Sequence, residues 1–505
     1  MTIFPVEIKR YFKEYHYWLI GIFVLVLAIR LFIVFQNPQF NYDAYFSLRQ
    51  VENIKSTGFP LYNDPLSYGG KTQLFAPLHY YVLTAFSLIF PTDLVAKILP
   101  NIFAALLTIL TFYIALKITK NSKIALTTSF MSGFIPILFL DINKISLDYL
   151  SLLLIFGVIY CIFRINDRRY IDYGLILIFM LVLTKPLAFI LILGLLFYLL
   201  LLKLENLQTT MKELEIILFF TFLVFWVNLL IYKNAFLSHG LLVIWQNIPL
   251  RIVSNFFDKI TFIETFYTIS IIPLILGIYA FYIAFYKEKN KDILLLIGFG
   301  ISSFLLLWFK LLTLVTGLVY LSVTLVILTS FALKHLSEFI KKTKIYRYQK
   351  LLLVVMIILF VITAIVPSVL MGLEKSRIGP TATDIEALKW ASQNIPKNAT
   401  ISASLEEGNA VAYFAKRKNI MDTNFLLTPK IDQRLNDLDT IYDTKFETEA
   451  VNILNEYKTN YIFVSSFDRQ KYSIEDPEYI SDKNCFTKIY YFESSDIYYT
   501  KCRIS

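Results

Sequence analysis

The residues best suited to chemistry in this sequence are carboxylates that stand next to long apolar segments. Asp43 opens the stretch "NYDAYFSLRQVENIKSTGFPLYNDPLSYGG" (41–70), directly after a hydrophobic run long enough to cross a bilayer. Asp141 and Asp148 flank Lys144 in "DINKISLDY" (141–149), beside another such run. A charge at the start of an apolar run is costly unless it faces a polar cavity, so Asp148 in particular is a functional candidate.

Other charged residues beside or within apolar runs are candidates for binding a phosphate or another part of the substrate. Lys185 in "LVLTKPLAF" and Lys310 in "LLLWFKLLTLVTG" interrupt apolar sequence. Each either snorkels to the membrane interface or offers a point charge to a phosphate. Arg49, in the helix predicted after Asp43, is a further candidate for binding the phosphate or the substrate. Glu264 in "KITFIETF" either is solvated in a loop or neutralises a cation or orients an acceptor.

Several function classes have no support. The sequence contains no GxGxxG, Walker-type loop, HExxH or CxxC pattern, which argues against nucleotide, zinc and redox chemistry. The basic residues lie in short loops between apolar runs rather than on one face of a folded domain, which argues against nucleic acid as a partner.

The elements that must position the candidates are membrane helices. The chain has 505 residues, of which 57% are hydrophobic and 17% charged, more apolar surface than a soluble protein of this length can use. Apolar runs of spanning length predict about eleven spans, near 17–36, 93–116, 124–140, 146–163, 171–184, 187–202, 214–232, 266–286, 293–309, 311–333 and 351–372. The first run has no cleavage site, so we expect it to be retained as a span.

The distribution of charge predicts the orientation. Up to residue 372 there are 31 basic and 18 acidic residues, a net charge of +13, whereas the remainder has 17 basic and 20 acidic residues, a net charge of −3. Every second connection is basic and is expected in the cytoplasm: Lys9/Arg10/Lys13, Lys117/Lys120/Lys123, Arg164/Arg168/Arg169, Lys203/Lys212, Lys287/Lys289/Lys291 and 334–350. The N-terminus is then inside, and the loop 37–92, the candidate carboxylates and everything after 372 are outside. The short run 75–90 breaks this alternation if counted, so we interpret it as an interfacial or re-entrant helix of the first outer loop.

After residue 372 the apolar runs stop and a smaller domain begins. "TATDIEALKWASQNI" has helix-capping residues and helical periodicity, "NATISAS" and "NYIFVSS" are strand-like, and "FTKIYYFESSDIYYTKCRI" predicts a β-ribbon. The fold class is therefore a polytopic α-helical membrane protein (1–372) with a small extracytoplasmic α/β domain (373–505). Cys485 and Cys502 lie in this outer domain, either as a disulfide or as two free thiols.

This layout resembles the GT-C superfamily of membrane glycosyltransferases, which use polyprenyl-phosphate-linked sugars. The stretch 41–70 is most similar to the first outer loop of oligosaccharyltransferase catalytic subunits, especially the archaeal type: an Asp, two aromatics, Leu-Arg, a Glu, then Gly-x-Pro and Asp-Pro. The segment 384–425 resembles the start of that family's outer domain, and "TFIE" (261–264) falls where the family has a Thr-Ile-x-Glu-like motif. The similarity covers most of the chain in layout and about 80 residues in recognisable motif. The sequence departs at 404–408, where the family's acceptor-reading WWDYG signature is replaced by "SLEEG", and the paired acidic motif of the second outer loop is not clean.

The resemblance implies roles for the candidates. Asp43 becomes the catalytic carboxylate that activates or positions the acceptor. Asp43, Asp141 and Asp148 become the ligands of a divalent cation, Mg²⁺ or Mn²⁺, if one is used. Arg49, Lys185, Lys310 and Glu264 become donor-phosphate or substrate contacts. The expected partners are a polyprenyl-phosphate-linked sugar, membrane lipid and a protein or lipid acceptor, with inversion at the anomeric carbon. A true oligosaccharyltransferase acting on Asn, a transporter or flippase of lipid-linked sugars, and a non-catalytic relative remain as alternatives.

Overall fold

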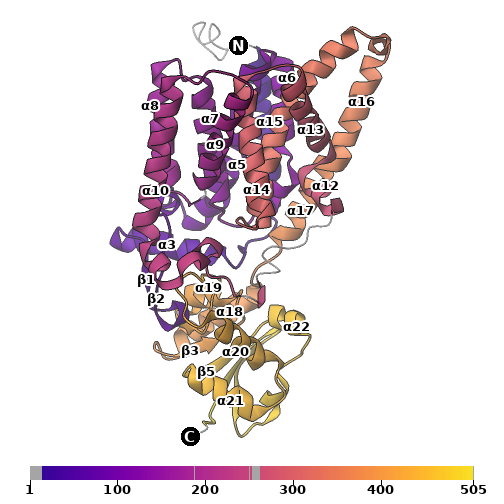
Figure 1. Ribbon diagram of the computed structural model, residues 1–505. Helices are drawn as coiled ribbons and strands as arrows, with labels where there is room; N and C mark the ends of the chain where they lie inside the picture. The colour runs from indigo at the N-terminus through magenta and orange to yellow at the C-terminus, as the bar shows by residue number, and fades with distance from the viewer. Residues whose placement is uncertain (1–13, 187, 250, 253–261, 504–505) are drawn as a thin grey trace.

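The chain folds into a helical bundle with a sheet-containing domain at one end. The computed structural model describes residues 14–186, 188–249, 251–252 and 262–503. Helix α3 and strands β1 and β2 of the first outer loop lie between the bundle and the C-terminal domain, which runs from orange to yellow in Figure 1.

Each of the eleven apolar runs contains helix, as predicted. Their side chains are apolar almost all round, which is typical of helices buried in lipid or in one another. The elements are α2 (Glu14–Val34), α5 (Thr92–Thr119), α6 (Ser122–Gly133) with η2 (Pro136–Phe139), α7 (Asp148–Phe163), α8 (Arg168–Val182), α9 (Ala188–Leu204), α10 (Met211–His239), α12 (Phe262–Ile269) with α13 (Ile271–Tyr286), α14 (Lys291–Trp308), α15 (Leu314–Lys341), and α16 (Gln349–Phe360) continuing through η5 (Val361–Ile365) into α17 (Val366–Ser376). A short η3 (Gly240–Trp245) follows α10, and η4 (Lys344–Tyr348) precedes α16.

Length and composition give fewer candidate membrane crossings than the eleven predicted. Within the described residues, six helical segments are long and apolar enough to cross a membrane, and α7, α9 and α13 are shorter apolar helices. The protein is thus a multi-pass membrane protein, while the count of eleven spans and their orientation stay predictions.

The bundle packs through close helix contacts at small residues. A Cβ atom added at Gly298 of α14 would lie 2.8 Å from the Gly194 carbonyl oxygen and 2.8 Å from the Tyr198 backbone nitrogen of α9. Small residues let the two backbones approach this closely, a common means of helix association in membranes.

The first outer loop is a folded unit rather than a connection. It contains α3 (Ala44–Thr57), the antiparallel pair β1 (Asn63–Asp64) and β2 (Lys71–Thr72), η1 (Ser67–Gly69) and α4 (Leu78–Ser87). Helix α4 is the short element predicted at 75–90. Its 10 residues rise only about 15 Å, half of a bilayer core, which agrees with an interfacial or re-entrant helix.

The C-terminal domain is a mixed five-stranded sheet covered by helices. The strand order is β4-β3-β5-β7-β6, with β3 parallel to both β4 and β5 and the remaining pairs antiparallel. The predicted helix after 380, the two predicted strands and the β-ribbon are all present. The elements are α18 (Ala382–Asn394), β3 (Thr400–Ser402), α19 (Gly408–Ala410), η6 (Val411–Ala415), β4 (Lys418–Asn419), α20 (Ile431–Asp443), α21 (Glu447–Glu456), β5 (Thr459–Val464), α22 (Ser466–Tyr472), η7 (Glu478–Ser481), β6 (Phe486–Phe492) and β7 (Ser495–Thr500).

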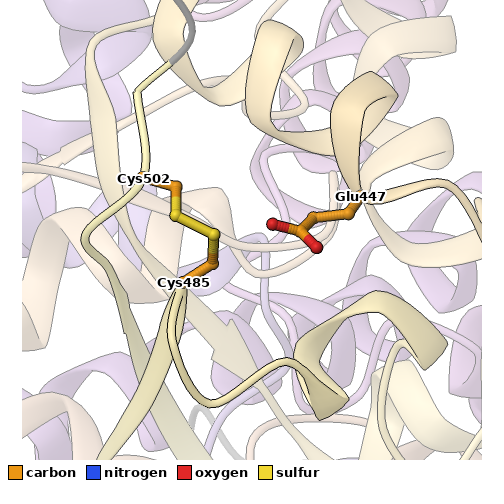
Figure 2. Close-up of side chains that lie close together, drawn as sticks. All are labelled: Glu447, Cys485 and Cys502. Atoms are coloured by element: carbon orange, nitrogen blue, oxygen red, sulfur yellow. A yellow bond between two sulfur atoms is a disulfide. The ribbon is translucent and has the colours of Figure 1, made fainter.

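Cys485 and Cys502 form a disulfide, one of the two possibilities left open by the sequence. Figure 2 shows the Glu447 carboxylate facing this bond. Because both sulfur atoms are used in the disulfide, neither is a thiolate, and the three residues do not make a metal site.

Candidate functional site

Asp43 lies at the N-terminus of α3, but its side chain does not cap that helix. Its carboxylate instead faces two other parts of the chain. The Thr423 hydroxyl donates to Oδ1 over 3.0 Å, and the Lys144 ammonium lies 3.7 Å from Oδ2. The side chain keeps half of its surface exposed. Both carboxylate oxygens therefore have a partner, and the side chain is still accessible to a ligand. Asp43 does not serve as a helix cap.

Lys144 lies between two of the three predicted carboxylates, Asp43 and Asp141. It lies 3.5 Å from Asp141 as well as 3.7 Å from Asp43. The pKa of Lys144 is raised, chiefly by Asp141, with smaller contributions from Asp43 and Asp148. Carboxylates from the first and second outer loops thus lie near one ammonium, and the central place of Lys144 was not predicted.

Asp148 forms a second part of this site with Lys185 and His79. The Lys185 ammonium donates to Asp148 over 2.8 Å. His79, on α4, is fully buried near this pair, and both of its ring nitrogens are unpartnered among the described residues. Burial lowers the pKa of His79 to about 4, which keeps the ring neutral at pH 7. A buried neutral imidazole with two unused nitrogens beside a lysine is suited to donating a hydrogen bond to an anion.

Asn143 ties the two loops together. Its side-chain amide donates to the Gln39 and Ser376 carbonyl oxygens, each over 2.9 Å, and its backbone carbonyl oxygen accepts from the Asn41 backbone N–H. The ends of α2 and α17 and the second outer loop therefore meet at this residue. Sequence reasoning passed over Asn143, because an uncharged side chain in a turn carries no pattern that identifies its partners.

Arg49 is buried in an ion pair within the first outer loop. Its two terminal guanidinium nitrogens donate to the two oxygens of Asp64 over 2.7 and 2.6 Å, and both residues are buried. Asp64 also accepts from the backbone N–H groups of Leu66 and Ser67. A bidentate pair of this kind fixes α3 against the β1–β2 hairpin. It gives Arg49 a structural role in the loop, and its role as a donor-phosphate or substrate contact stays a prediction.

Lys310 and Glu264 are the remaining residues predicted to contact the donor phosphate or the substrate. Lys310 is exposed between α14 and α15, and its carbonyl oxygen accepts from the Trp245 indole N–H over 2.8 Å. Among the described residues its ammonium has no carboxylate within 4 Å. Glu264 belongs to α12, and its side chain lies outside what the structure describes.

The "SLEEG" segment is mostly buried. Ser404, Glu407 and Gly408 are buried, and the Ser404 hydroxyl donates to Glu407. Glu406, the partly exposed member, is paired with Lys471 at 2.8 Å. The side-chain amide of the next residue, Asn409, donates to the Thr423 hydroxyl over 3.1 Å, and this hydroxyl donates to Asp43. The segment therefore leads into Asn409, which contacts Thr423, and it has no aromatic side chains.

The three carboxylates do not form a single cluster of possible metal ligands in the part of the chain that the structure describes. Among the described residues, Asp43, Asp141 and Asp148 do not bring their oxygen atoms within 4.8 Å of one another, as ligands of one ion would. Lys144 lies between the first two and Lys185 beside the third. In this arrangement ammonium groups occupy the positions where a cation's charge would act.

Comparison with known proteins agrees with this architecture. No protein-family model matches the chain, and no curated protein is significantly similar to it in sequence. Among solved structures, it matches that of an Archaeoglobus fulgidus oligosaccharyltransferase tethered to an acceptor peptide with the NVT sequon, with a TM-score of 0.63 and 15% identity over 90% of this chain and 70% of the other. The oligosaccharyltransferase AglB from Archaeoglobus fulgidus, in complex with an inhibitory peptide and a dolichol-phosphate, gives a TM-score of 0.64 and 14% identity, over 89% and 69% of the two chains.

A second kind of structure matches over the whole length. ArnT from Cupriavidus metallidurans bound to undecaprenyl phosphate gives a TM-score of 0.60 and 12% identity, over 95% of this chain and 97% of the other. The chain thus has the fold of the GT-C membrane glycosyltransferases. In particular, it resembles the archaeal oligosaccharyltransferase AglB, as the first outer loop indicated.

Proposed function

We propose that this protein is a glycosyltransferase that moves a sugar or glycan from a polyprenyl-phosphate-linked donor to an acceptor on the outer face of the cell membrane. The observation that carries the proposal is the pairing of Lys144 with both Asp43 and Asp141, next to the Asp148–Lys185 pair and where Asp43 contacts Thr423 of the C-terminal domain. Similar folds that bind dolichol-phosphate and undecaprenyl phosphate support a lipid-phosphate donor. The C-terminal domain, from about residue 373, is then extracytoplasmic.

In the proposed reaction Asp43 receives the proton of the acceptor's nucleophilic group. That group forms a bond with the anomeric carbon while the bond from this carbon to the phosphate oxygen breaks, and the electron pair leaves with the lipid phosphate. Because the nucleophile and the phosphate lie on opposite sides of the carbon, the configuration inverts. Its half-exposed carboxylate makes Asp43 able to reach an acceptor from the outer side.

The leaving phosphate is assigned to Lys185, with Lys310 as a second cation. Lys185 uses one hydrogen bond for Asp148, and an ammonium has three donors, so two remain for phosphate oxygens. The buried His79 beside this pair adds a neutral donor. Preorganised donors at developing negative charge are a large part of catalysis in such transfers.

A protein acceptor is the second possibility within this reaction class. It is favoured by the matched structure with a tethered acceptor peptide, and disfavoured by the buried "SLEEG" segment, which lacks the aromatic residues of the WWDYG signature. Peptides with and without the Ser or Thr of an Asn-x-Ser/Thr sequon separate the two. A requirement for the sequon would identify an oligosaccharyltransferase.

Mass spectrometry of lipid-linked and protein-linked glycans tests the proposed function in cells. Loss of the gene should remove one class of glycosylated product and leave its lipid-linked donor in excess. The wild-type gene and the Asp93→Asn variant, which changes an exposed carboxylate outside the cluster, should restore the product, and Asp43→Asn should not. Unchanged glycans after loss of the gene would contradict the proposal and favour a non-catalytic relative.

A further inference from the structure

A chain of hydrogen bonds reaches Asp43 from the C-terminal domain. The Thr423 hydroxyl, in the loop after β4, donates to Asp43 Oδ1 over 3.0 Å, although the two residues are 380 positions apart. The Asn409 Nδ2 group, on α19, donates to the same Thr423 oxygen over 3.1 Å. Asn409 is almost fully buried, so its amide has few other partners available.

The direction of these hydrogen bonds is set by Asn424, which contacts Asn409. Asn424 Nδ2 approaches Asn409 Oδ1 at 3.4 Å, which orients the Asn409 amide with its nitrogen toward Thr423. Because the Thr423 oxygen accepts from Asn409, its own proton is left to donate to the carboxylate. The loop itself is anchored, since the Asn424 backbone N–H donates to the buried Asp422, which pairs with Lys71 of β2.

The two oxygens of Asp43 consequently have different partners. The C-terminal domain holds Oδ1 through a neutral hydroxyl, and the second outer loop holds Oδ2 through the Lys144 ammonium at 3.7 Å. A carboxylate with one oxygen held has fewer orientations to sample, which is the condition for efficient proton transfer to a bound group.

We propose that Thr423, supported by Asn409, is a positioning residue for Asp43, so that the C-terminal domain sets the orientation of the catalytic carboxylate. This inference rests on the proposed function and adds to it a role for the loop that follows the "SLEEG" segment. The reaction then requires the hydroxyl group of Thr423, and a side chain of the same volume without a hydroxyl does not replace it.

The test is steady-state kinetics of the purified full-length protein in detergent–lipid micelles, with a short-chain polyprenyl-phosphate-linked sugar as donor. Thr423→Val should lower kcat about tenfold to a hundredfold, the usual cost of a misplaced catalytic group, with the donor KM unchanged. Thr423→Ser should restore most of the rate, since it keeps the hydroxyl. Thr72→Val is the matched control, because it makes the same change at an exposed threonine of the adjacent hairpin.

Asn409→Ala provides a second arm. It should reduce kcat less than Thr423→Val, and the double variant should be no slower than Thr423→Val alone, since both act through one hydrogen bond to Asp43. Thermal unfolding of each variant shows whether the protein is still folded.

The outcomes separate the inference from the function. If Asp43→Asn is inactive but Thr423→Val keeps the wild-type kcat, the positioning role is wrong and the proposed function stands. The positioning role is also wrong if Thr423→Ser is as slow as Thr423→Val, or if the effects of Asn409→Ala and Thr423→Val add. A wild-type protein that transfers no sugar overturns both proposals.

Discussion

At the scale of single residues, Lys144 does the most to define the site. It brings a positive charge between Asp43 and Asp141 and within electrostatic reach of Asp148. Without it, three carboxylates from two loops would repel one another at the same place. Lys144 thus lies where the resemblance implies the charge of a divalent cation.

Transfer should therefore depend on Lys144 and not on an added metal. We expect a chelator such as EDTA to leave the rate of transfer within about twofold, and Lys144→Met to reduce it by at least about a hundredfold, the scale of losing one preorganised charge in a catalytic site. The measurement is donor turnover in chelator-treated protein, with and without added Mg²⁺ or Mn²⁺. Loss of activity that either ion restores would show that the carboxylates hold a metal.

Arg49 should matter for stability and not for donor binding. Removing one partner of a buried ion pair typically costs about 3–5 kcal/mol, because the other charge stays buried without compensation. We expect Arg49→Met to lower the unfolding temperature clearly and to leave the donor KM of the folded fraction unchanged. Lys55→Met, which removes an exposed charge from the same helix, is the control. A stable Arg49→Met protein with a raised donor KM would return Arg49 to the substrate site.

The sequence predicted the carboxylates but not their neighbours. Asp43, Asp141 and Asp148 stand out because a charge beside an apolar run has a visible energetic cost. Thr423 and Asn143 are ordinary polar residues in loops, and their partners are fixed only by tertiary contacts between distant segments. The pairing of Arg49 with Asp64 was not predicted for a similar reason: it depends on the fold of the first outer loop, which no periodicity reveals.

At the scale of elements, helix-capping residues in the sequence correctly predicted where a helix begins. Thr381 and Asp384 make a capping box at the start of α18, where capping residues were recognised in the sequence. The bends of the bundle were not recognised: α6 ends at Gly133 and is followed by η2, within one predicted run. Pro136 explains the interruption, because a proline removes a backbone donor.

The "SLEEG" segment should make the C-terminal domain sensitive to pH. Burial, with the nearby Asp468, raises the pKa of Glu407, and burial raises the pKa of Asp468 to about 6 from its usual 3.8. Each of these two carboxyls then holds its proton more tightly in the native state than in the unfolded chain. The stability that each contributes is fully present below its ordinary pKa of about 4 and is lost as the pH rises through its raised folded pKa.

Replacing Glu407 should remove part of this dependence. Glu407→Gln is expected to unfold at a higher temperature than the wild type at pH 8, and the difference should shrink toward pH 5. The check is thermal unfolding of the full-length protein at several pH values, with Glu406→Gln as the control because Glu406 is partly exposed and paired with Lys471. A Glu407→Gln protein with an unchanged pH dependence would contradict this account.

At the scale of the whole molecule, orientation decides which substrates reach the site. The basic loops predict that the Asp43 cluster and the C-terminal domain face outward. The background for labelling is favourable, because Cys161 is buried and the other two cysteines form a disulfide. In intact cells a membrane-impermeant maleimide should label Ser56→Cys in α3 and should not label Lys123→Cys, both of which are exposed positions. The reverse pattern would place the site in the cytosol.

The most direct test of the central claim is release of polyprenyl phosphate from a polyprenyl-phosphate-linked sugar by the purified protein in the presence of a membrane-fraction acceptor. Wild-type protein and Asp93→Asn should release the lipid phosphate together with a glycosylated product, and Asp43→Asn, although folded, should release neither. Equal turnover by Asp43→Asn and wild-type protein would contradict the assignment of catalysis to the carboxylate cluster around Lys144.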